Sequence, residues 1–187
     1  MIKSKEELND YLMADKRAMR ISLRRPRIFR DEIWKFEIYL RRLEYYTNCN
    51  KNIYNRFILL YYKFQFHRLS VKLGFYIQPN TFGKGLAIAH IGPVIVNDYA
   101  KIGSNCRIHV GVNIGGGINK PEDAPTIGEN VYIGPGAKIY GRIKIGNNVA
   151  IGANAVVNKD VPDNVTVAGV PAKIVNNKGN IRNSKKE

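Results

Sequence analysis

The histidines and cysteines are the side chains of this sequence best suited to act as a base or a nucleophile near neutral pH. The histidines are His67, His90 and His109, and the cysteines are Cys49 and Cys106. A single histidine is more often structural than catalytic, and two isolated cysteines form neither a disulfide framework nor a metal-ligand spacing. The residue types are therefore compatible with proton transfer, but they do not indicate which residue performs it.

Positive charge is the second chemical feature of the chain. Thirty Lys and Arg residues stand against 15 Asp and Glu residues, a formal net charge of +15. Such an excess suits an anionic partner, namely a phosphate-rich ligand, an acidic membrane surface or nucleic acid. The sequence carries no nucleic-acid-binding motif, so no nucleic-acid partner is expected. It has no apolar stretch near the ~20 residues of a membrane helix and no apolar signal core, so we expect a cytoplasmic protein.

A six-residue repeat must position any site in the second half of the chain. From residue 127 an aliphatic residue recurs at every sixth position, and a second small or aliphatic residue follows each one four positions later. The first set is Ile127, Ile133, Ile139, Ile145, Ile151 and Val157, and the second is Val131, Ala137, Ile143, Val149, Ala155 and Val161. This period predicts three short strands per coil with tight corners, stacked as a parallel prism of roughly five coils over residues 77–167.

Two irregularities interrupt the repeat. The register slips by two residues between Val94 and Ile102, and the Gly- and Pro-rich segment 115–126 leaves the repeat altogether. Loops that leave a rigid solenoid often carry its function. We therefore expect a binding site beside these two segments.

The first 73 residues are predicted to be helical. Residues 4–7 have the form of a capping box, and Pro26 and the segment 48–50 are expected helix breaks. Apolar stripes at helical spacing run through Ile33, Phe36, Leu40 and Leu43, and through Ile53, Phe57, Leu60 and Phe64. We predict a helical region at 1–73, a β-helix at 74–175 and a polar tail at 176–187.

Four segments of the repeat resemble the serine acetyltransferase branch of the hexapeptide acyltransferases. They are residues 111–116, 133–139, 151–157 and 168–173, of which the last has the form of the closing signature of these enzymes. The resemblance implies a left-handed parallel β-helix, although most parallel crossovers are right-handed. It also implies a homotrimer that binds acetyl-CoA between adjacent prisms and transfers the acetyl group directly to a hydroxyl, without an acyl-enzyme or a metal.

The same resemblance assigns roles to individual residues. The catalytic general base is His90, within residues 88–92. The acetyl-CoA-binding residues are Gly116, Pro135, Ala153, Asn158, Lys159 and Lys173. A lysine near the phosphates of CoA would act as a point charge. Neither cysteine lies beside His90 in the repeat, so a thiol nucleophile is not expected.

The acceptor side departs from the serine acetyltransferase pattern. Tyr76 stands where the family has an aspartate that orients the catalytic histidine, and Ala89 replaces the aspartate directly before that histidine. Residues 122–125 lack the arginine and histidine that would hold the carboxylate of serine. The remaining acceptor-side candidates are Tyr76, Asn97, Asp98 and His109.

These departures resemble the serine-acetyltransferase-like enzymes of capsule and exopolysaccharide synthesis. The sequence therefore predicts an acetyl-CoA-dependent O-acetyltransferase that acts on a sugar hydroxyl of a glycan precursor. Two alternatives stay open, a serine O-acetyltransferase of cysteine biosynthesis and a non-catalytic trimeric scaffold of the same fold. The aromatic and basic residues of the N-terminal region would also suit a peripheral membrane contact.

Overall fold

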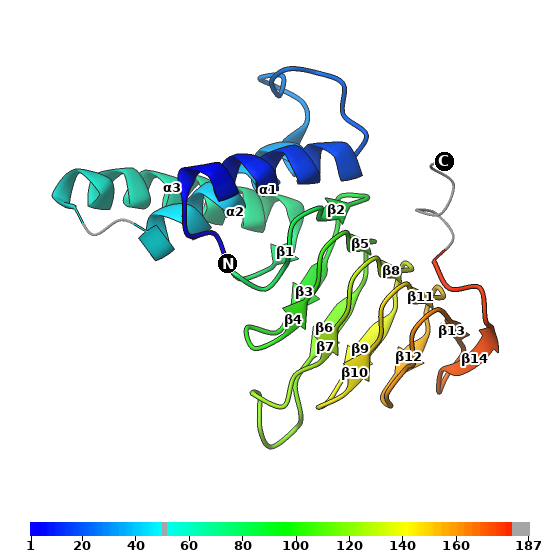
Figure 1. The fold of residues 1–187 in the computed structure, drawn as a ribbon. Coiled ribbons are helices and arrows are strands. Elements are labelled where there is room, and N and C mark those ends of the chain that lie inside the picture. Colours follow the sequence, from blue (N-terminus) through cyan, green and yellow to red (C-terminus); the bar gives the residue numbers. More distant parts are fainter. Residues whose placement is uncertain (50–51, 181–187) are drawn as a thin grey trace.

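Three helices are followed by a prism of short strands in the structure, a computed structural model that describes residues 1–49 and 52–180 (Figure 1). The helices are α1 (Lys5–Ala18), α2 (Glu32–Cys49) and α3 (Ile53–Leu73). They lie together at one end of the prism, beside β1 and β2, and the C-terminal strands lie at the other end. Within the described residues, no helix is both long and apolar enough to cross a membrane.

The helix ends agree with the sequence prediction in part: Pro26 lies between α1 and α2 as predicted, but α2 continues through Asn48 and Cys49 of the predicted break at 48–50. Ser4 caps α1, since its side chain accepts a hydrogen bond from the backbone N–H of Glu7 at 3.1 Å. The Glu7 carboxylate accepts from the backbone N–H of Lys3, not from that of Ser4, so the predicted capping box is shifted by one residue. Helix α3 begins after Asn52 and ends at Gly74, whose φ of 74° is favourable for glycine. Asn50, part of the predicted break, lies outside the described residues.

One of the two predicted apolar stripes is not buried. On α2, Phe36, Leu40 and Leu43 are buried as expected. On α3, Phe57 and Phe64 are 69% and 66% exposed, and Ile53 and Leu60 are exposed as well. The buried residues of α3 are instead Tyr62, Leu69 and Leu73. Helix α3 is apolar on most of its faces, so the pattern alone does not choose the buried face. Packing against α2 chooses it, with Tyr62 stacked on Tyr46 at a centroid distance of 5.3 Å.

Three sheets form the sides of the prism. Sheet A contains β1 (Phe75–Tyr76), β3 (Val94–Val96), β6 (Asn113–Gly115), β9 (Lys138–Tyr140) and β12 (Val156–Val157). Sheet B contains β4 (Lys101–Ile102), β7 (Thr126–Ile127) and β10 (Lys144–Ile145). Sheet C contains β2 (Ala87–Ile88), β5 (Arg107–Ile108), β8 (Tyr132–Ile133), β11 (Ala150–Ile151), β13 (Thr166–Ala168) and β14 (Lys173–Asn176). The named strands pair in parallel except β13 and β14, which are antiparallel.

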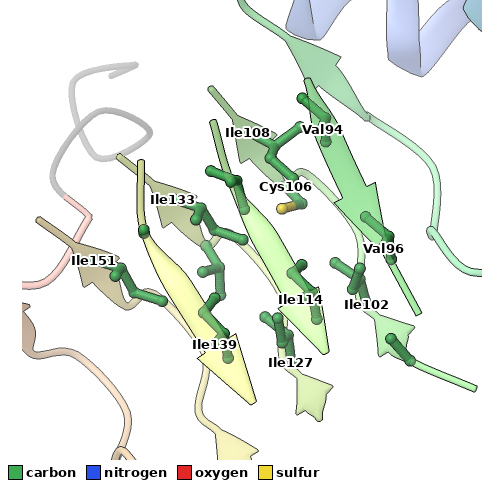
Figure 2. Packing of buried hydrophobic residues seen from close by; sticks show 14 of the residues in the cluster. Val94, Val96, Ile102, Cys106, Ile108, Ile114, Ile127, Ile133, Ile139 and Ile151 are labelled. Carbon is green, nitrogen blue, oxygen red and sulfur yellow. The ribbon is translucent and has the colours of Figure 1, made fainter. Parts of the chain in front are cut away.

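The predicted repeat register is confirmed by the strand pairing. Ile108 pairs with Ile133, and Ile133 with Ile151, so that equivalent repeat positions form a continuous column in sheet C. The same positions point into the prism and are fully buried (Figure 2). Each core residue therefore packs on its equivalent in the next coil, which explains the strict aliphatic spacing of the sequence.

Asparagine and glycine have separate roles at the corners between sheets B and C. The corner residues Asn105, Asn130, Asn148 and Asn164 all have left-handed backbones, with φ between 56° and 62°. Their side chains form a ladder in which Asn130 donates to Asn148 at 3.1 Å and Asn148 donates to Asn164 at 2.9 Å. The repeat glycines serve close approach between coils, because a Cβ on Gly134 would lie 2.8 Å from the backbone nitrogen of Ala153.

The C-terminal segment is more ordered than the predicted tail. Strand β14 continues to Asn176, and the backbone N–H of Asn180 donates to the carbonyl of Asn148 at 2.8 Å. Residues 177–180 therefore pack on the prism. Residues 181–187, the rest of the predicted tail, lie outside the described residues.

Candidate functional site

The predicted site residues fall on two different corners of the prism. The turns that connect sheet C to sheet A, here called the C–A corner, carry His90 in the first coil, Pro135 two coils further on and Ala153 in the coil after that. The turns that connect sheet A to sheet B, here called the A–B corner, carry Asn97, Asp98, Asn158, Lys159 and the loop that contains Gly116. The two corners flank sheet A, so one chain presents two separate groups of candidate residues.

His90 is exposed at the C–A corner, in a turn whose backbone is fixed on both sides. The N–H of Ala89 donates to the carbonyl of Ile108 at 3.0 Å, and the N–H of Gly92 donates to the carbonyl of Leu73 at 3.1 Å. The turn is thus tied to the next coil and to the end of α3. An exposed imidazole on a fixed backbone can meet a substrate in a reproducible position, as general base catalysis requires.

Two aromatic side chains extend from His90 along sheet C. The ring of His109 lies 5.7 Å from the ring of His90, and the ring of Tyr132 lies 5.1 Å from that of His109, measured between centroids. His109 is thus the one acceptor-side candidate that the chain brings to His90. Tyr132 is a neighbour that the sequence analysis missed, although its place directly before the core residue Ile133 marks it as facing outward.

Two of the positions predicted to bind acetyl-CoA, Pro135 and Ala153, form an exposed column above His90. Gly136 donates to the carbonyl of Val110 at 2.9 Å and Asn154 donates to the carbonyl of Pro135 at 2.9 Å, so the corner turns stack directly on one another. With coils about 4.8 Å apart, Ala153 lies roughly 14 Å along the prism from the level of His90. Pro135 and Ala153 are both exposed, which leaves their backbone open to an extended ligand.

The two lysines predicted to contact CoA lie on opposite sides of sheet A. Lys159 follows β12 at the A–B corner. Lys173 begins β14, where it pairs with Ala168 of sheet C, and the N–H of the preceding Ala172 donates to the carbonyl of Val156. Both side chains are exposed. A single chain does not bring these two charges together.

Tyr76, Asn97 and Asp98 border a hollow of about 270 Å³ on sheet A and the A–B corner. Tyr99 and Pro121 complete its rim. Asn97 accepts a hydrogen bond from the backbone N–H of Tyr99 at 2.8 Å, which fixes the turn that follows β3. Among the described residues, no hydrogen bond or ion pair joins these three candidates to His90. Within the described part of one chain, none of these three residues therefore orients His90 through a hydrogen bond.

The irregular loop between β6 and β7 is folded compactly over this hollow. Gly117 donates to the carbonyl of Asp123 and Asp123 donates to that of Lys120, each at 3.0 Å. Gly116 lies against the carbonyl of Pro121, and a side chain at this position would collide with it. Arg142, one coil further along the A–B corner, approaches Asp123 at 4.0 Å and is 86% exposed. The turn between β9 and β10 therefore places an exposed cation beside the loop, which the sequence did not indicate.

The cysteines do not contribute to either group of residues. Cys106 is buried in the prism core, and burial raises the pKa of its thiol to about 12. Burial also raises the pKa of the Cys49 thiol. The thiolate, which is the nucleophilic form, is thus disfavoured at both positions.

Comparison with known proteins supports the repeat and its relatives. The family model described as bacterial transferase hexapeptide (six repeats) matches residues 124–159. The serine acetyltransferase of Synechococcus elongatus is 39% identical over 115 residues, 60% of this chain and 47% of the relative. That of Staphylococcus epidermidis is 45% identical over 108 residues, 57% of this chain and 51% of the relative. The chain thus spans about half the length of the curated relatives it matches.

Solved structures give the same result over more of the chain. The serine acetyltransferase from Brucella abortus has a TM-score of 0.72 and 30% identity, and the match covers 93% of this chain and 71% of that one. A serine acetyltransferase in complex with CoA has a TM-score of 0.69 and 28% identity, covering 91% and 70%. These neighbours support the left-handed β-helix with N-terminal helices.

The expected sugar acceptor is wrong in the light of these comparisons. The curated relatives at 39–45% identity and the structural neighbours are serine acetyltransferases, so the capsule and exopolysaccharide pattern has no support. That prediction depended on Tyr76, Ala89 and the loop residues 122–125. Ala89 lies at a corner, residues 122–125 lie in a loop and Tyr76 is an exposed residue of β1, so the sequence can vary at these positions without changing the prism core. The absence of the family's acceptor-binding side chains at these positions therefore does not identify a different acceptor.

Proposed function

Because this chain belongs to the hexapeptide-repeat transferases and is homologous to serine acetyltransferases, we propose that it transfers the acetyl group of acetyl-CoA to the hydroxyl of L-serine. The observation that carries this proposal is the exposed His90 at the foot of the C–A corner column, in a prism up to 45% identical to serine acetyltransferases. A non-catalytic scaffold would not require an exposed imidazole on a fixed turn at this position.

His90 acts as the general base in the proposed reaction. It removes the proton of the serine hydroxyl while the oxygen attacks the carbonyl carbon of the thioester. The new C–O bond forms, the C–S bond breaks, and the proton passes from the imidazole to the departing sulfur. The products are O-acetylserine and CoA. No acyl-enzyme forms, in agreement with the burial of Cys106.

A homotrimer completes the site in this proposal. If the A–B corner of one subunit packs beside the C–A corner of the next, Asn97, Asp98 and the loop of one chain face His90 of its neighbour. The same arrangement brings Lys159 of one subunit near Lys173 of another, where they form a cationic end for the phosphates of CoA. Gly116, Pro135, Ala153 and Asn158 line the groove between them.

Serine needs an anion for its ammonium group and a cation for its carboxylate. On the A–B corner, Asp98 supplies the anion. Arg142 is an exposed cation beside the loop and approaches Asp123, and we propose that it replaces the arginine that residues 122–125 lack. This gives the acceptor site a complete set of charges from residues of this chain.

Acetyl transfer from acetyl-CoA tests this function directly. The purified chain is incubated with acetyl-CoA and L-serine, thiol release is followed, and O-acetylserine is identified by mass spectrometry. D-serine, L-homoserine and an oligosaccharide are compared at equal concentration. Turnover with L-serine well above the others and above acetyl-CoA hydrolysis is expected. Thiol release that does not respond to L-serine would refute the proposed acceptor.

The exposed apolar face of α3 supports a peripheral membrane contact as a second part of the proposal. Phe57, Leu60 and Phe64 are exposed, and the α3 sequence contains Arg and Lys residues but no Asp or Glu. Such a face suits an anionic lipid surface. Co-flotation with phosphatidylglycerol vesicles, and not with neutral vesicles, is expected. If the chain does not float with vesicles and the Phe57→Ser/Phe64→Ser variant no longer forms the trimer, the exposed face of α3 is a subunit contact.

A further inference from the structure

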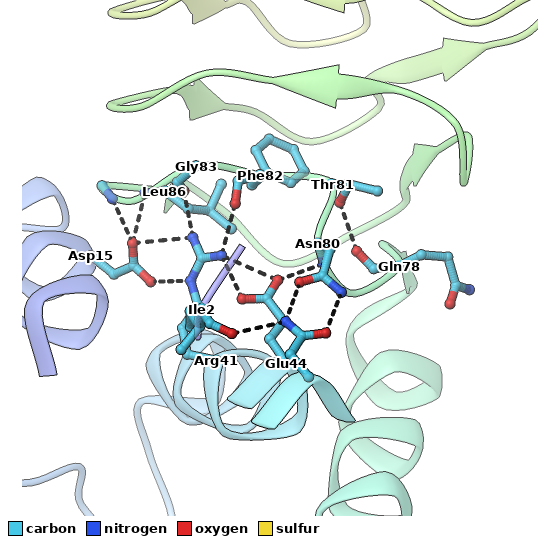
Figure 3. A network of polar contacts seen from close by, with 12 residues as sticks. Ile2, Asp15, Arg41, Glu44, Gln78, Asn80, Thr81, Phe82, Gly83 and Leu86 are labelled. Carbon is cyan, nitrogen blue, oxygen red and sulfur yellow. Dashed lines mark hydrogen bonds and ion pairs between the residues drawn. The ribbon is translucent and has the colours of Figure 1, made fainter. Parts of the chain in front are cut away.

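The first coil of the prism has no preceding coil to accept and donate its backbone hydrogen bonds. In the interior of the prism, each coil satisfies the N–H and C=O groups of its neighbours. At the open end these groups would be buried under the helices without partners, which is costly. Figure 3 shows that side chains from α1 and α2 take the place of the missing coil over residues 80–86.

Arg41 is the centre of this group and is completely buried. Its guanidinium donates to the carbonyls of Phe82 at 3.0 Å and Gly83 at 2.7 Å. It also forms ion pairs with Asp15 at 2.7 Å and Glu44 at 3.0 Å.

The carboxylates of Asp15 and Glu44 continue this row of contacts with the first coil. Asp15 accepts from the N–H groups of Gly85 and Leu86, and Glu44 accepts from that of Asn80. Backbone N–H or C=O groups at positions 80, 82, 83, 85 and 86 of the open end are thus paired with buried charged side chains.

Glu37 extends the row to the strand that leads to His90. Its Oε1 accepts a hydrogen bond from the backbone N–H of Ile88 at 3.2 Å, and the residue is 1% exposed. In β2, the N–H groups of Ala87 and Ala89 point the other way and donate to the next coil, each at 3.0 Å. Ile88 therefore depends on the helix for its partner, and His90 follows it by two residues.

The charge of Glu37 differs from that of its neighbours. One guanidinium, that of Arg41, faces three buried carboxyl groups, and it contacts Asp15 and Glu44 but not Glu37. Glu37 Oε2 has no hydrogen-bond partner among the described residues. Burial, and to a smaller extent the charge of Asp15, raises the pKa of Glu37 well above its ordinary value. A protonated carboxyl still accepts through its carbonyl oxygen, so the bond to Ile88 survives in the uncharged form.

We propose that Glu37 is a positioning residue for His90, acting through its hydrogen bond to the backbone of β2. The bond fixes Ile88 in the plane of sheet C, and the turn that carries His90 begins directly after it. Misplacement of a catalytic base by about 1 Å can cost up to ~10²-fold in rate. This inference depends on the proposed role of His90 as the base, while the bond itself can be tested without any substrate.

Two substitutions separate the hydrogen bond from the packing. Glu37→Gln keeps a carbonyl oxygen at the same place and has no charge, whereas Glu37→Leu keeps apolar volume and leaves the Ile88 N–H without an acceptor. Glu44→Gln serves as the matched control, because Glu44 belongs to the same buried group but contacts Asn80 and not β2. Each variant is tested as the full chain in its native oligomeric state.

The first measurement is hydrogen exchange of the peptide containing residues 86–91, with the peptide 150–157 as internal reference. Glu37→Leu is expected to raise exchange in 86–91 by roughly tenfold while the reference stays protected, and Glu37→Gln is expected to leave both unchanged. The second measurement is acetyl transfer. Glu37→Leu should lower kcat about tenfold with an unchanged KM for acetyl-CoA, and Glu37→Gln should restore most of the rate.

The outcomes separate this inference from the proposed function. If Glu37→Leu leaves β2 protected, or if Glu44→Gln lowers kcat as strongly as Glu37→Leu, Glu37 does not position His90 and the group only stabilises the fold. If the unmodified chain shows no acetyl transfer, the proposed function fails. In that case the exchange data, with the rate of diethylpyrocarbonate modification of His90, still show whether Glu37 holds the turn in place.

Discussion

The imidazole rings of His109 and His90 lie 5.7 Å apart on neighbouring coils, although 18 residues separate them in sequence. The register explains the approach. The backbone N–H of Ala89 donates to the carbonyl of Ile108, so positions 89 and 109 follow the parallel register of β2 and β5. An aspartate at position 89, as in the family pattern, would put a carboxylate there. With alanine at position 89, no carboxylate stands there, and the ring of His109 is the neighbour that the structure places beside His90.

Replacement of His90 by alanine should remove the base and leave the prism intact, because the side chain is exposed. The expected loss in kcat is roughly 10²–10⁴-fold, with little change in the KM for acetyl-CoA. His67→Ala is the matched control, since His67 is also exposed but lies on α3. Steady-state kinetics of thiol release measures both variants, and equal rates for His90→Ala and the unmodified chain would exclude the mechanism.

His109 should act mainly through its ring. An aromatic pair at this distance contributes about 1 kcal/mol, so His109→Ala is expected to lower kcat/KM by roughly two- to tenfold. His109→Phe keeps the ring and should retain most of the activity. The same assay compares the two variants. If the phenylalanine variant is as impaired as the alanine variant, an imidazole nitrogen of His109 is required and the packing role is wrong.

Arg142 is expected to hold the carboxylate of the acceptor. Arg142→Ala should raise the KM for L-serine by about 10-fold or more, while the KM for acetyl-CoA changes little, because a charge-assisted pair is lost only on the acceptor side. Lys63→Ala removes the same charge from the exposed surface of α3 and should have no effect. If the KM for serine stays constant in Arg142→Ala, Arg142 does not bind the carboxylate, and another cation of the corner must do so.

The asparagine ladder should contribute to the stability of the prism through both backbone and side chain. Asn148 has a φ of 56° and exchanges side-chain hydrogen bonds with Asn130 and Asn164. Asn148→Ala loses these bonds and strains the left-handed backbone, for a total of about 2–4 kcal/mol. Asn148→Gly relieves the strain and should lose less. Urea unfolding at fixed protein concentration measures the difference, and equal losses would mean that the backbone conformation contributes nothing.

The sequence predicted the parts of the fold that depend on local pattern. A period of six residues admits few structures other than a prism, so the positions of Ile108, Ile133 and Ile151 could be assigned without coordinates. The face of α3 could not, because the helix is apolar nearly all round and only its packing on α2 selects Tyr62 over Phe57. The hydrophobic period of a sequence indicates the type of element, but it does not indicate which neighbouring element a helix packs against.

The candidate site was predictable to a similar extent. The repeat places His90 and the corner positions above it on the prism, whereas the roles predicted for them come from the resemblance to serine acetyltransferases. Glu37 could not be found in this way, since a glutamate within a helix normally indicates an exposed surface. Its role depends on the open end of the prism, a property of the assembled fold. Arg142, the cation that we propose for the acceptor carboxylate, could not be found from the sequence for a related reason. It lies 20 residues after Glu122 in sequence and approaches the loop at Asp123 only through the stacking of coils.

Glu37 should make the stability of the protein depend on pH in a direction opposite to that of an ion-paired carboxylate. Burial raises the pKa of Glu37 above its ordinary value of 4.5, with Asp15 adding to the rise and Arg41 and the Ile88 N–H opposing it. In the unfolded chain the group ionises near pH 4.5, whereas in the folded chain it stays protonated. Its contribution is therefore fully present below about pH 4.5 and is lost as the pH rises toward the folded pKa.

The Glu37→Gln variant has no proton to lose, so it isolates this effect. Between pH 5 and pH 8 the free energy of unfolding of the unmodified chain should fall relative to that of Glu37→Gln, by at most about 1.4 kcal/mol per pH unit. Urea unfolding at one protein concentration measures both curves, since oligomer stability depends on concentration. Asp15, Arg41 and Glu44 are present in both chains, so their titration cancels to first order. Parallel curves over this range would mean that Glu37 is ionised in the folded protein, and a buried, unpaired carboxylate would then stand under β2, the strand that precedes the turn with His90.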